Sequence, residues 1–416
     1  HATVTGNTIQ LAYPENGGMA TGTLHVAQPC SGFRILLPFI ALGGVLLVVG
    51  LIGVGLVFTK GHEAVYGVSR EVPWGLLIAS YAYLVITSTG LAFIGGLGHA
   101  FGFQAFAKMN KRIVVLAFIT LLAGFTQIGM ELGHPFRLMY LFLLSPQFKA
   151  PIVWMGMFYS IELLILALEL YLIFRPDPAS HRMTGFLGFL ALLVGVVATS
   201  NLGFVFGSIN ARPFYQGIYF PVFLVTSGIA AGAALLLVIH NIVFRFRIKA
   251  ELRDSMQALG KLLGLGISAM ILLYFWKFAA SLYSEPQGMT QAAMALLSGP
   301  LAAHFWIGEV GLALILPLLL IVLCRARNST LLGLSGLVYL IGLFFTRYNF
   351  IVAGQLPPMR QGFEGSGVHT VNGLVSYSPS PVEWMIFALG LGIFFVGYFL
   401  AERFINLETD HTGGTP

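Results

Sequence analysis

Three ionisable side chains stand close together in the stretch MELGHPFRLMY, between two long apolar runs: Glu131, His134 and Arg137. A carboxylate and an imidazole exchange protons, and imidazole and guanidinium groups donate hydrogen bonds to carbonyl oxygens. Trp74, in SREVPWG, opens another apolar run, and its indole offers a flat face to a ring. Together these residues predict a site for a quinone, which needs donors for its carbonyls and groups that exchange protons. The alternative is an ordinary interfacial belt, in which Trp and Arg anchor helix ends.

Two carboxylates lie inside the apolar run that follows. Glu162 falls about 16 Å into the expected helix, near the bilayer midplane, and Glu169 about 10 Å further on, on nearly the same face. A charge at that depth costs about 2.5–3.5 kcal/mol on insertion scales, so each one needs a reason. One interpretation is a relay that leads protons from the cytoplasmic side toward the quinone site. The other is a neutral Glu hydrogen-bonded to a neighbouring helix.

Tyr159 and Lys277 are further candidates for the lining of the quinone site, from two different apolar runs. Lys277 also has two structural interpretations: pairing with a carboxylate, or extension of its long side chain to the membrane surface. Glu309 follows His304 at the start of another run, and we interpret it as a helix-start residue at the interface rather than a catalytic one.

The chain lacks the residues for an iron–sulfur cluster, because it has two cysteines, Cys30 and Cys324, and a cluster needs about four thiolates. His99 and His240 fall near helix ends, where they are either polar end residues or the ligands of a bis-histidine haem. Four well-placed histidines, which two haems would need, are not present in the sequence. We therefore expect this chain to bind no metal, haem or iron–sulfur cluster. A redox role then requires a lipid-soluble quinone and a partner protein.

The composition predicts a polytopic membrane protein. Of the 416 residues 57% are hydrophobic and 9% charged, with a mean hydropathy of +0.86, whereas soluble domains carry about 25% charged residues. The excess of Lys and Arg (22) over Asp and Glu (16) needs no nucleic-acid partner, because basic cytoplasmic loops account for it.

Ten apolar runs are long enough to cross a bilayer, which needs about 20 residues. They are 35–58, 74–98, 112–130, 151–174, 183–206, 218–243, 261–282, 301–323, 330–350 and 382–403. A weak repeat, WMGMFYSIELL against WIGEVGLALIL, predicts two four-helix bundles, roughly 74–206 and 218–350, flanked by the first and last helices. The expected fold is all-α.

The sequence predicts three regions. Residues 1–34 are an N-terminal extension, 35–404 a single transmembrane domain, and 405–416 a C-terminal cytoplasmic tail. Residues 1–18 are polar and match no signal peptide, and Met19 would open a more ordinary N-terminus. Our hypothesis is that 1–18 come from an upstream start or are foreign to the native chain.

Ten spans place both termini on one side of the membrane. That side carries most of the Lys and Arg, whereas the loops of the other side, with which we count Arg212 and Arg347, carry fewer. The positive-inside rule therefore predicts cytoplasmic termini. We expect the membrane to be a bacterial or archaeal cytoplasmic membrane. The long connections 131–150, 283–300 and 351–381 then lie on the outer face.

The segments EVPWGLLIASYAYLVITSTGLAF and MELGHPFRLMYLFLLSPQFKAPIVWMG resemble the NrfD/PsrC family of quinone-interacting membrane subunits. RYNFIVAGQLPP and YSPSPVEWMIFALG resemble its ten-helix (HybB/DsrP-like) branch, which serves hydrogenase and sulfur-metabolising complexes. The resemblance runs from about residue 35 to near the end. The sequence departs from the family pattern in that it has no histidine at the start of the VPWG helix, His62 being the nearest, and has Glu131 and His134 where many relatives have Asp and Arg.

The resemblance implies a subunit that exchanges electrons between a membrane quinone, either menaquinone or ubiquinone, and a periplasmic iron–sulfur partner of the ferredoxin type. It places the quinone beside Trp74 and the segment from Glu131 to Arg137. Two other functions fit a protein with ten helices and buried charges. One is a secondary transporter, and the other is a membrane anchor that holds electron-transfer subunits and binds no quinone.

Overall fold

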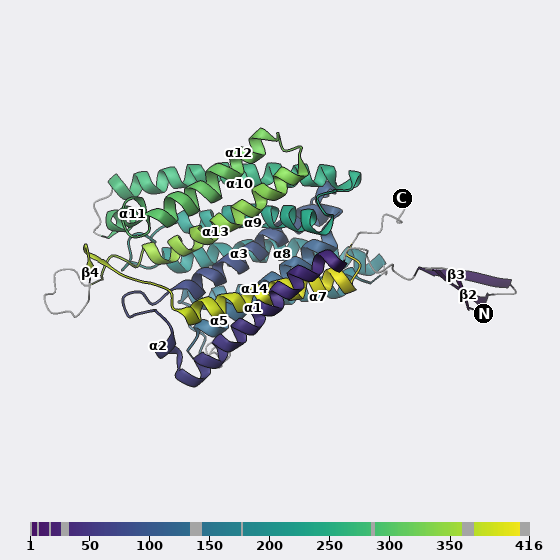
Figure 1. Ribbon diagram of the computed structural model, residues 1–416, viewed down its shortest axis with the longest axis horizontal. Helices are drawn as coiled ribbons and strands as arrows, with labels where there is room; N and C mark the ends of the chain where they lie inside the picture. Colours follow the sequence, from purple (N-terminus) through teal and green to yellow (C-terminus); the bar gives the residue numbers. More distant parts are fainter. Residues whose placement is uncertain are drawn as a thin grey trace.

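The computed structural model describes residues 2–5, 8–15, 18–25, 33–133, 144–175, 178–283, 288–359 and 370–407. Among these residues, ten helices are long and apolar enough to cross a membrane, as the sequence predicts. They run side by side along the long axis, with both termini at one end (Figure 1). The protein is therefore an all-α, multi-pass membrane protein.

The long helices begin and end within a few residues of the predicted runs, except that the seventh starts earlier, at Arg253. They are α1 (Phe33–Lys60), α3 (Leu76–Ala100), α5 (Asn110–Glu131), α7 (Pro151–Ile173), α8 (Pro178–Gly207), α9 (Tyr219–Val243), α10 (Arg253–Tyr283), η2 with α12 (His304–Ile315 and Leu316–Leu323), α13 (Ser329–Ala353) and α14 (Pro381–Phe404). Short helices are α2 (His62–Val65), α4 (Gln104–Ala107), η1 (Ala250–Leu252) and α11 (Met289–Leu297).

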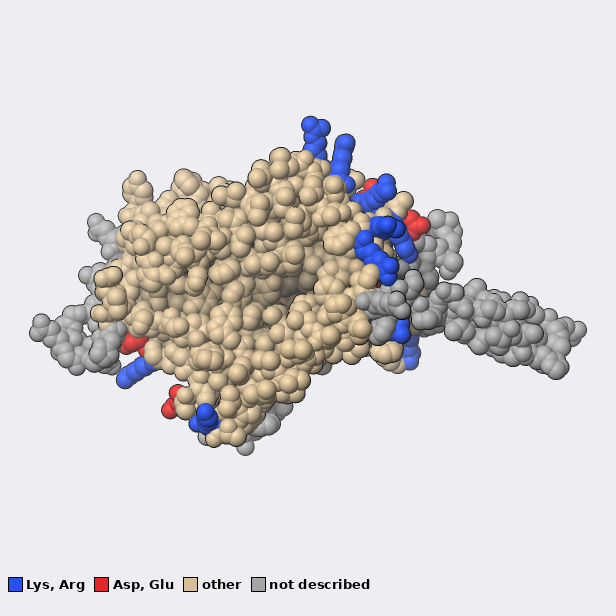
Figure 2. Space-filling view, in the orientation of Figure 1, with Lys and Arg blue, Asp and Glu red and all other residues tan. Residues whose placement is uncertain are grey.

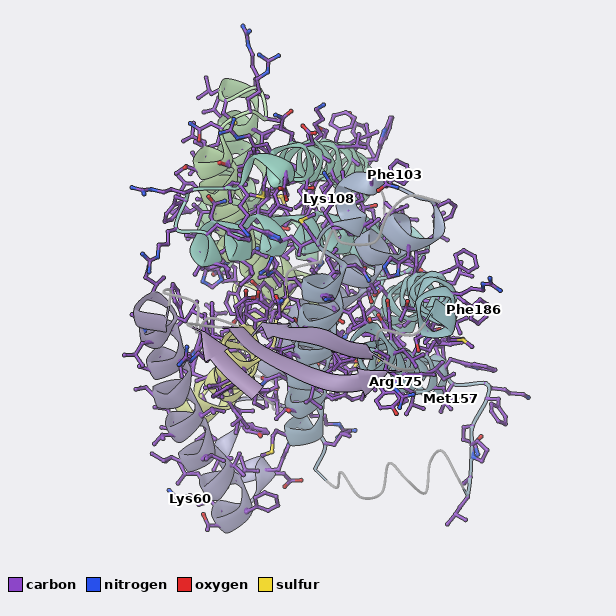
Figure 3. The ribbon with its side chains drawn as sticks, turned by 90° about the vertical axis from the view of Figure 1, so that its right-hand side faces the viewer. Lys60, Phe103, Lys108, Met157, Arg175 and Phe186 are labelled. Atoms are coloured by element: carbon purple, nitrogen blue, oxygen red, sulfur yellow. The ribbon has the colours of Figure 1, made fainter. Side chains whose placement is uncertain are left out.

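The helices pack in two groups with a pair at the side. One group is α3, α5, α7 and α8, and the other is α9, α10, η2 with α12, and α13. Helices α3 and α9 join the groups, and α1 lies along α14 (Figure 1). In the view from the end that carries the termini, most helices are seen nearly end-on (Figure 3). There Lys108, between α4 and α5, donates to the backbone carbonyl of Glu251 at 3.1 Å and so links the two groups.

The contact between α3 and α9 depends on glycine. A Cβ at Gly90 would overlap the backbone carbonyl of Gly228, and a Cβ at Gly232 would meet the backbone of Gly90. Small residues let membrane helices approach this closely, since packing rather than a hydrophobic driving force holds them together. The two groups of helices therefore share one continuous core.

Two small sheets accompany the helices, and the sequence analysis predicted neither. Strands β1 (Ala2–Thr5), β2 (Thr8–Glu15) and β3 (Gly18–His25) pair antiparallel within the N-terminal extension. Strands β4 (Thr370–Val371) and β5 (Leu374–Val375) flank Asn372 and Gly373, which both have positive φ. Asn-Gly is the pair that two-residue hairpins favour, and this sequence signal was available.

Candidate functional site

The carboxylate of Glu383 joins three segments at the end of the molecule opposite the termini. It is fully buried in the first turn of α14 and forms a capping box with Ser380. One oxygen accepts from the backbone N–H of Gly67 (2.9 Å) and of Ser380 (2.7 Å), and the other accepts from the Tyr377 hydroxyl (2.6 Å). That hydroxyl in turn accepts from the N–H of Leu76 (2.7 Å), a donor that the start of α3 leaves unsatisfied. The starts of α3 and α14 are thereby fixed to one another.

Trp74 lies beside this network, at the predicted end of the molecule. The side chain of Gln355 donates to its backbone carbonyl at 2.8 Å and accepts from its backbone N–H at 3.1 Å. The indole is half-buried and meets the ring of Phe206 edge-on, with centroids 5.2 Å apart. Arg212 holds Gln355 in turn, because its guanidinium donates to the Gln355 carbonyl at 2.9 Å. Burial lowers the pKa of Arg212.

Glu131 ends α5 next to the same network. Its backbone carbonyl accepts from His62 Nε2 at 2.6 Å, and the carbonyl of Met130 accepts from the Tyr66 hydroxyl at 2.9 Å. Burial and the nearby charges of Glu131 and Glu383 raise the pKa of Tyr66, so Tyr66 lies within the field of both carboxylates. Within the described residues, Glu131 Oε2 is buried and has no hydrogen-bond partner. Among the described residues, nothing competes with a proton or a ligand for this oxygen.

A cavity of about 400 Å³ opens beside Tyr377. Its polar groups include His304, Tyr348 and Tyr377, and the His304 ring lies 5.4 Å from the Tyr348 ring. His304 Nδ1 is buried without a hydrogen-bond partner in the described part of the protein. The other lining residues are mostly apolar or aromatic: Leu301, Phe344, Phe345, Val352, Leu356, Val375 and Trp384. An apolar pocket with a few convergent polar groups is the usual form of a small-molecule site.

Of the predicted quinone ligands, the structure brings Trp74 and Glu131 to one end but puts neither in the wall of the cavity. His134 and Arg137 lie outside the described residues. The sequence analysis missed Tyr377, His304 and Glu383. A signal for Glu383 was present, because Ser380 and Glu383 have the spacing of a capping box ahead of an apolar run.

Tyr159 belongs to a different series of polar groups, inside the first group of helices. Its hydroxyl lies 3.0 Å from Thr199 Oγ1, which donates to Thr89 Oγ1 at 3.0 Å, and Thr89 donates to Glu162 Oε1 at 3.3 Å. Glu162 and Glu169 are both buried, and Glu169 Oε1 lies 3.9 Å from His99 Nδ1 toward the end of the termini. The structure therefore links Tyr159 to Glu162 and not to the cavity beside Tyr377.

Lys277 is buried in the second group of helices and does not extend to the surface. Its ammonium donates to the carbonyl of Phe214 at 2.5 Å and lies 4.6 Å from the centre of the Phe214 ring. A second cavity of about 20 Å³ contains both Lys277 and Glu309 in its lining. Glu309 lies near the start of its helix but is not a surface residue: it is 3% exposed and accepts from Asn349 Nδ2 at 2.6 Å and from the Tyr274 hydroxyl.

Arg347 likewise lies inside a span and not in a loop. It is fully buried in α13, and its guanidinium donates to Ser227 Oγ at 2.9 Å. His240, considered above for haem, has protein partners on both ring nitrogens: the Leu236 carbonyl at 2.8 Å and the Arg112 guanidinium at 3.4 Å. No group of three or more His, Cys, Asp or Glu in the described ranges is placed to hold a metal ion.

Comparison with known proteins identifies relatives along nearly the whole sequence. The C subunit of selenate reductase from Mesobacillus selenatarsenatis is 24% identical over 410 residues, covering 89% of this chain and 95% of that protein. The Hdr-like menaquinol oxidoreductase integral membrane subunit of Archaeoglobus fulgidus is 23% identical, with 80% and 85% covered. The C polypeptide of polysulfide reductase from Wolinella succinogenes is 29% identical over 170 residues, 39% of this chain and 51% of that protein. Residues 64–358 match the family model for polysulphide reductase NrfD, and the chain belongs to this family.

Proposed function

We propose that this chain is the quinone-binding membrane subunit of a redox complex and that the cavity beside Tyr377 holds the quinone ring. The observation that carries the proposal is the cavity itself. Its volume of about 400 Å³ lies within the range of small-molecule sites, and its walls are aromatic and aliphatic. It also adjoins the hydrogen-bond network of Tyr377 and Glu383, beside which Gln355 fixes Trp74. The name of the menaquinol oxidoreductase subunit, a relative over most of the sequence, supports a quinol as the substrate.

The cavity residues fit a quinone by chemistry. His304 Nδ1 is free to hydrogen-bond a quinone carbonyl or a quinol hydroxyl. Phe344 and Trp384 offer faces for the ring, and we propose that a lipid-borne substrate enters past Trp384, which is 45% exposed on α14. Burial and the bond to Glu383 raise the pKa of Tyr377, so its hydroxyl stays protonated at neutral pH and keeps its hydrogen bond to Glu383 at the edge of the cavity. A quinol bound here supplies two electrons and two protons.

The remaining predicted residues take supporting places in this proposal. Trp74 and Glu131 border the network behind Tyr377, and His134 and Arg137 stay predictions for the same end. Tyr159 and Lys277 would act away from the ring. Glu162 and Glu169, with Thr89, Thr199 and Tyr159 in the same series, would lead protons through the first group of helices.

The electrons need a partner, since we propose that this chain holds neither haem nor an iron–sulfur cluster. We propose a periplasmic iron–sulfur subunit of the ferredoxin type, docked on the face opposite the termini, near the cavity, with further redox subunits beyond it. The relatives named as components of selenate and polysulfide reductases support such a complex. Exposed Lys and Arg gather at the end of the termini, which supports a cytoplasmic position for that end (Figure 2).

A photoreactive quinone tests the position of the ring. The complex, purified with its partners, is irradiated with an azidoquinone, and the labelled peptides are mapped. We expect labels in the peptides that carry His304, Tyr348 or Trp384, and competition by unlabelled quinone. Labels near Trp74 and Glu131 instead would move the ring to the first group of helices. Trp276, an indole on α10 that is 63% exposed and outside the cavity, controls for labelling from the lipid phase.

The two rival functions predict different results. A secondary transporter would move a solute in proteoliposomes without any partner, and no metalloprotein would copurify with it. A structural anchor would copurify with its partners, but it would show no saturable labelling and no loss of quinol oxidation in His304→Ala. Saturable labelling together with quinol-dependent reduction of the copurified metal centre would exclude both.

A further inference from the structure

One helix carries both His304 and Glu309, and its geometry is unusual. The segment η2, His304–Ile315, is a π-helix, in which each backbone N–H bonds to the carbonyl five residues earlier. Residues five apart are therefore closer to one side of the helix than in an α-helix, where they would point about 140° apart. π-Helical turns occur frequently at functional sites. This geometry brings His304 and Glu309 nearer to one side of the helix than an α-helix would, and each of them lines a cavity.

The two residues line two neighbouring cavities. His304 is in the wall of the cavity of about 400 Å³ beside Tyr377, here called the large cavity. Glu309 is in the wall of the cavity of about 20 Å³, here called the small cavity. Helix α13 repeats this arrangement with consecutive residues, since Tyr348 lines the large cavity and Asn349 the small one. The two cavities therefore share η2 and α13 as parts of their walls.

The small cavity has polar groups where η2 and α13 meet. Glu309 accepts from Asn349 and Tyr274 there, and Lys277 also lines this cavity. Tyr219 Oη and Asn349 Oδ1 are buried and have no hydrogen-bond partner within the described residues. A volume of about 20 Å³ holds one water, which needs about 10–15 Å³ and two to four polar partners. Charged and titratable groups near Glu309 are Lys277, Arg347, Tyr219 and Tyr274.

We propose that His304 and Glu309 form a proton-transfer pair that connects the large cavity with Lys277, through the second group of helices. The inference rests on the proposed quinone site. It gives a role to a carboxylate that neither the quinone site nor the series of Glu162 and Glu169 uses. The ammonium of Lys277 donates a hydrogen bond to the backbone carbonyl of Phe214, in the loop between α8 and α9. This route therefore leads to the face opposite the termini.

The step balances in protons and electrons. A quinol hydroxyl loses its proton to a ring nitrogen of His304, and His304 passes a proton to the carboxylate of Glu309. From there it reaches Lys277 through one water, as Lys277, which is 6% exposed, gives its own proton to a second water at the loop that carries Phe214. A second proton follows in the same way, and the two electrons go one at a time to the metal centre of the partner subunit. Quinone reduction runs the same steps backward.

Glu309→Gln in the purified complex is the first test. The amide keeps the shape and still accepts one hydrogen bond, but it carries no proton. General acid–base groups contribute about 10²–10⁴-fold, so we expect quinol turnover to fall by about 10²-fold with KM unchanged. Glu309→Asp should recover part of the rate because it restores a carboxyl group. Glu63→Gln, an exposed carboxylate on α2, is the matched control and should leave the rate unchanged.

Infrared difference spectra, taken with and without a bound quinol analogue, give a readout that is independent of turnover. We expect a carboxyl C=O band that Glu309→Gln removes and Glu162→Gln leaves in place. The reverse pattern would route the proton through the first group of helices and overturn the inference, as would normal turnover of Glu309→Gln. Analogue affinity is measured on the same samples. If the wild-type complex does not bind the analogue, the proposed quinone site is wrong. If all variants bind it with the wild-type affinity, a loss of turnover in Glu309→Gln reports on proton transfer and not on quinone binding.

Discussion

The buried oxygen of Glu131 gives the first test at the scale of single residues. Glu131→Gln keeps the size of the side chain and removes its ability to exchange a proton. We expect quinol-linked turnover to fall by about 10²-fold or more while the complex still assembles, because the backbone contacts to His62 and Tyr66 do not involve the carboxylate. Turnover and native gel electrophoresis of the purified complex measure both. Normal turnover would remove Glu131 from the site, and His134→Ala tests the neighbouring prediction in the same way.

Arg112 and Glu402 form a buried ion pair far from the cavity beside Tyr377. Arg112 on α5 and Glu402 on α14 are 3% and 9% exposed and form two hydrogen bonds, of 2.7 and 3.2 Å. Removing one partner of such a pair leaves a buried charge and typically costs about 3–5 kcal/mol, whereas apolar replacement of both is often neutral. We expect Glu402→Leu to lower the thermal unfolding temperature strongly. The double variant Arg112→Met with Glu402→Leu should recover most of the loss.

The same samples separate stability from function. Because the pair lies toward the end of the termini, turnover per folded complex should be unchanged in the double variant. If Glu402→Leu unfolds at the wild-type temperature, the pair contributes nothing to stability. If instead the double variant is as unstable as the single one, packing around Tyr398, which donates to Glu402 at 2.7 Å, is the main term.

At the scale of elements, the glycine contact between α3 and α9 has a direct test. A Cβ at Gly90 would overlap the carbonyl of Gly228, so Gly90→Ala must push the two helices apart. Overpacking of this kind costs about 1–3 kcal/mol. Gly44→Ala on α1 is the control, because no atom lies within 4 Å of the added carbon. Detergent unfolding should show a loss for the first variant and no loss for the second, and equal stability of the two would mean that α3 and α9 do not depend on this contact.

The helices themselves could be predicted from sequence because a span needs an apolar run of fixed length. The order of the apolar runs also predicted that Trp74 and Glu131 lie at the same end of the molecule, because one stands where a span begins and the other where the next span ends. The cavity could not be predicted, because His304, Tyr348 and Tyr377 come from three segments whose packing no local pattern encodes. The inward direction of Glu309 depends on π-helical geometry, and a π-helix has the same apolar composition as an α-helix.

At the scale of the whole molecule, one end is basic. Two turns at that end have an arginine in the left-handed backbone conformation, which is unfavourable for any residue with a Cβ. Helices α9 and α12 both end with two residues of positive φ, Arg245 with Phe246 and Arg325 with Ala326. Glycine is the usual residue in this position, because a Cβ disfavours the left-handed conformation. Both arginines are exposed and lie in loops at the end where Lys and Arg gather in Figure 2. Their charge would help to fix the orientation of the protein in the membrane.

The last prediction is this orientation. A fluorescent reporter fused after Pro416 should fluoresce in intact cells, and alkaline phosphatase inserted between Asn372 and Gly373 should be active, because the first folds in the cytoplasm and the second outside it. The double variant Arg245→Gly with Arg325→Gly should weaken the preference for cytoplasmic termini, measured as the ratio of the two reporter signals. The helices should stay folded, since glycine suits both turns. Opposite reporter signals would put the large cavity near the cytoplasmic face. The electron-transfer partner would then have to dock from inside the cell, and the outward route through Glu309 and Lys277 would release its protons there.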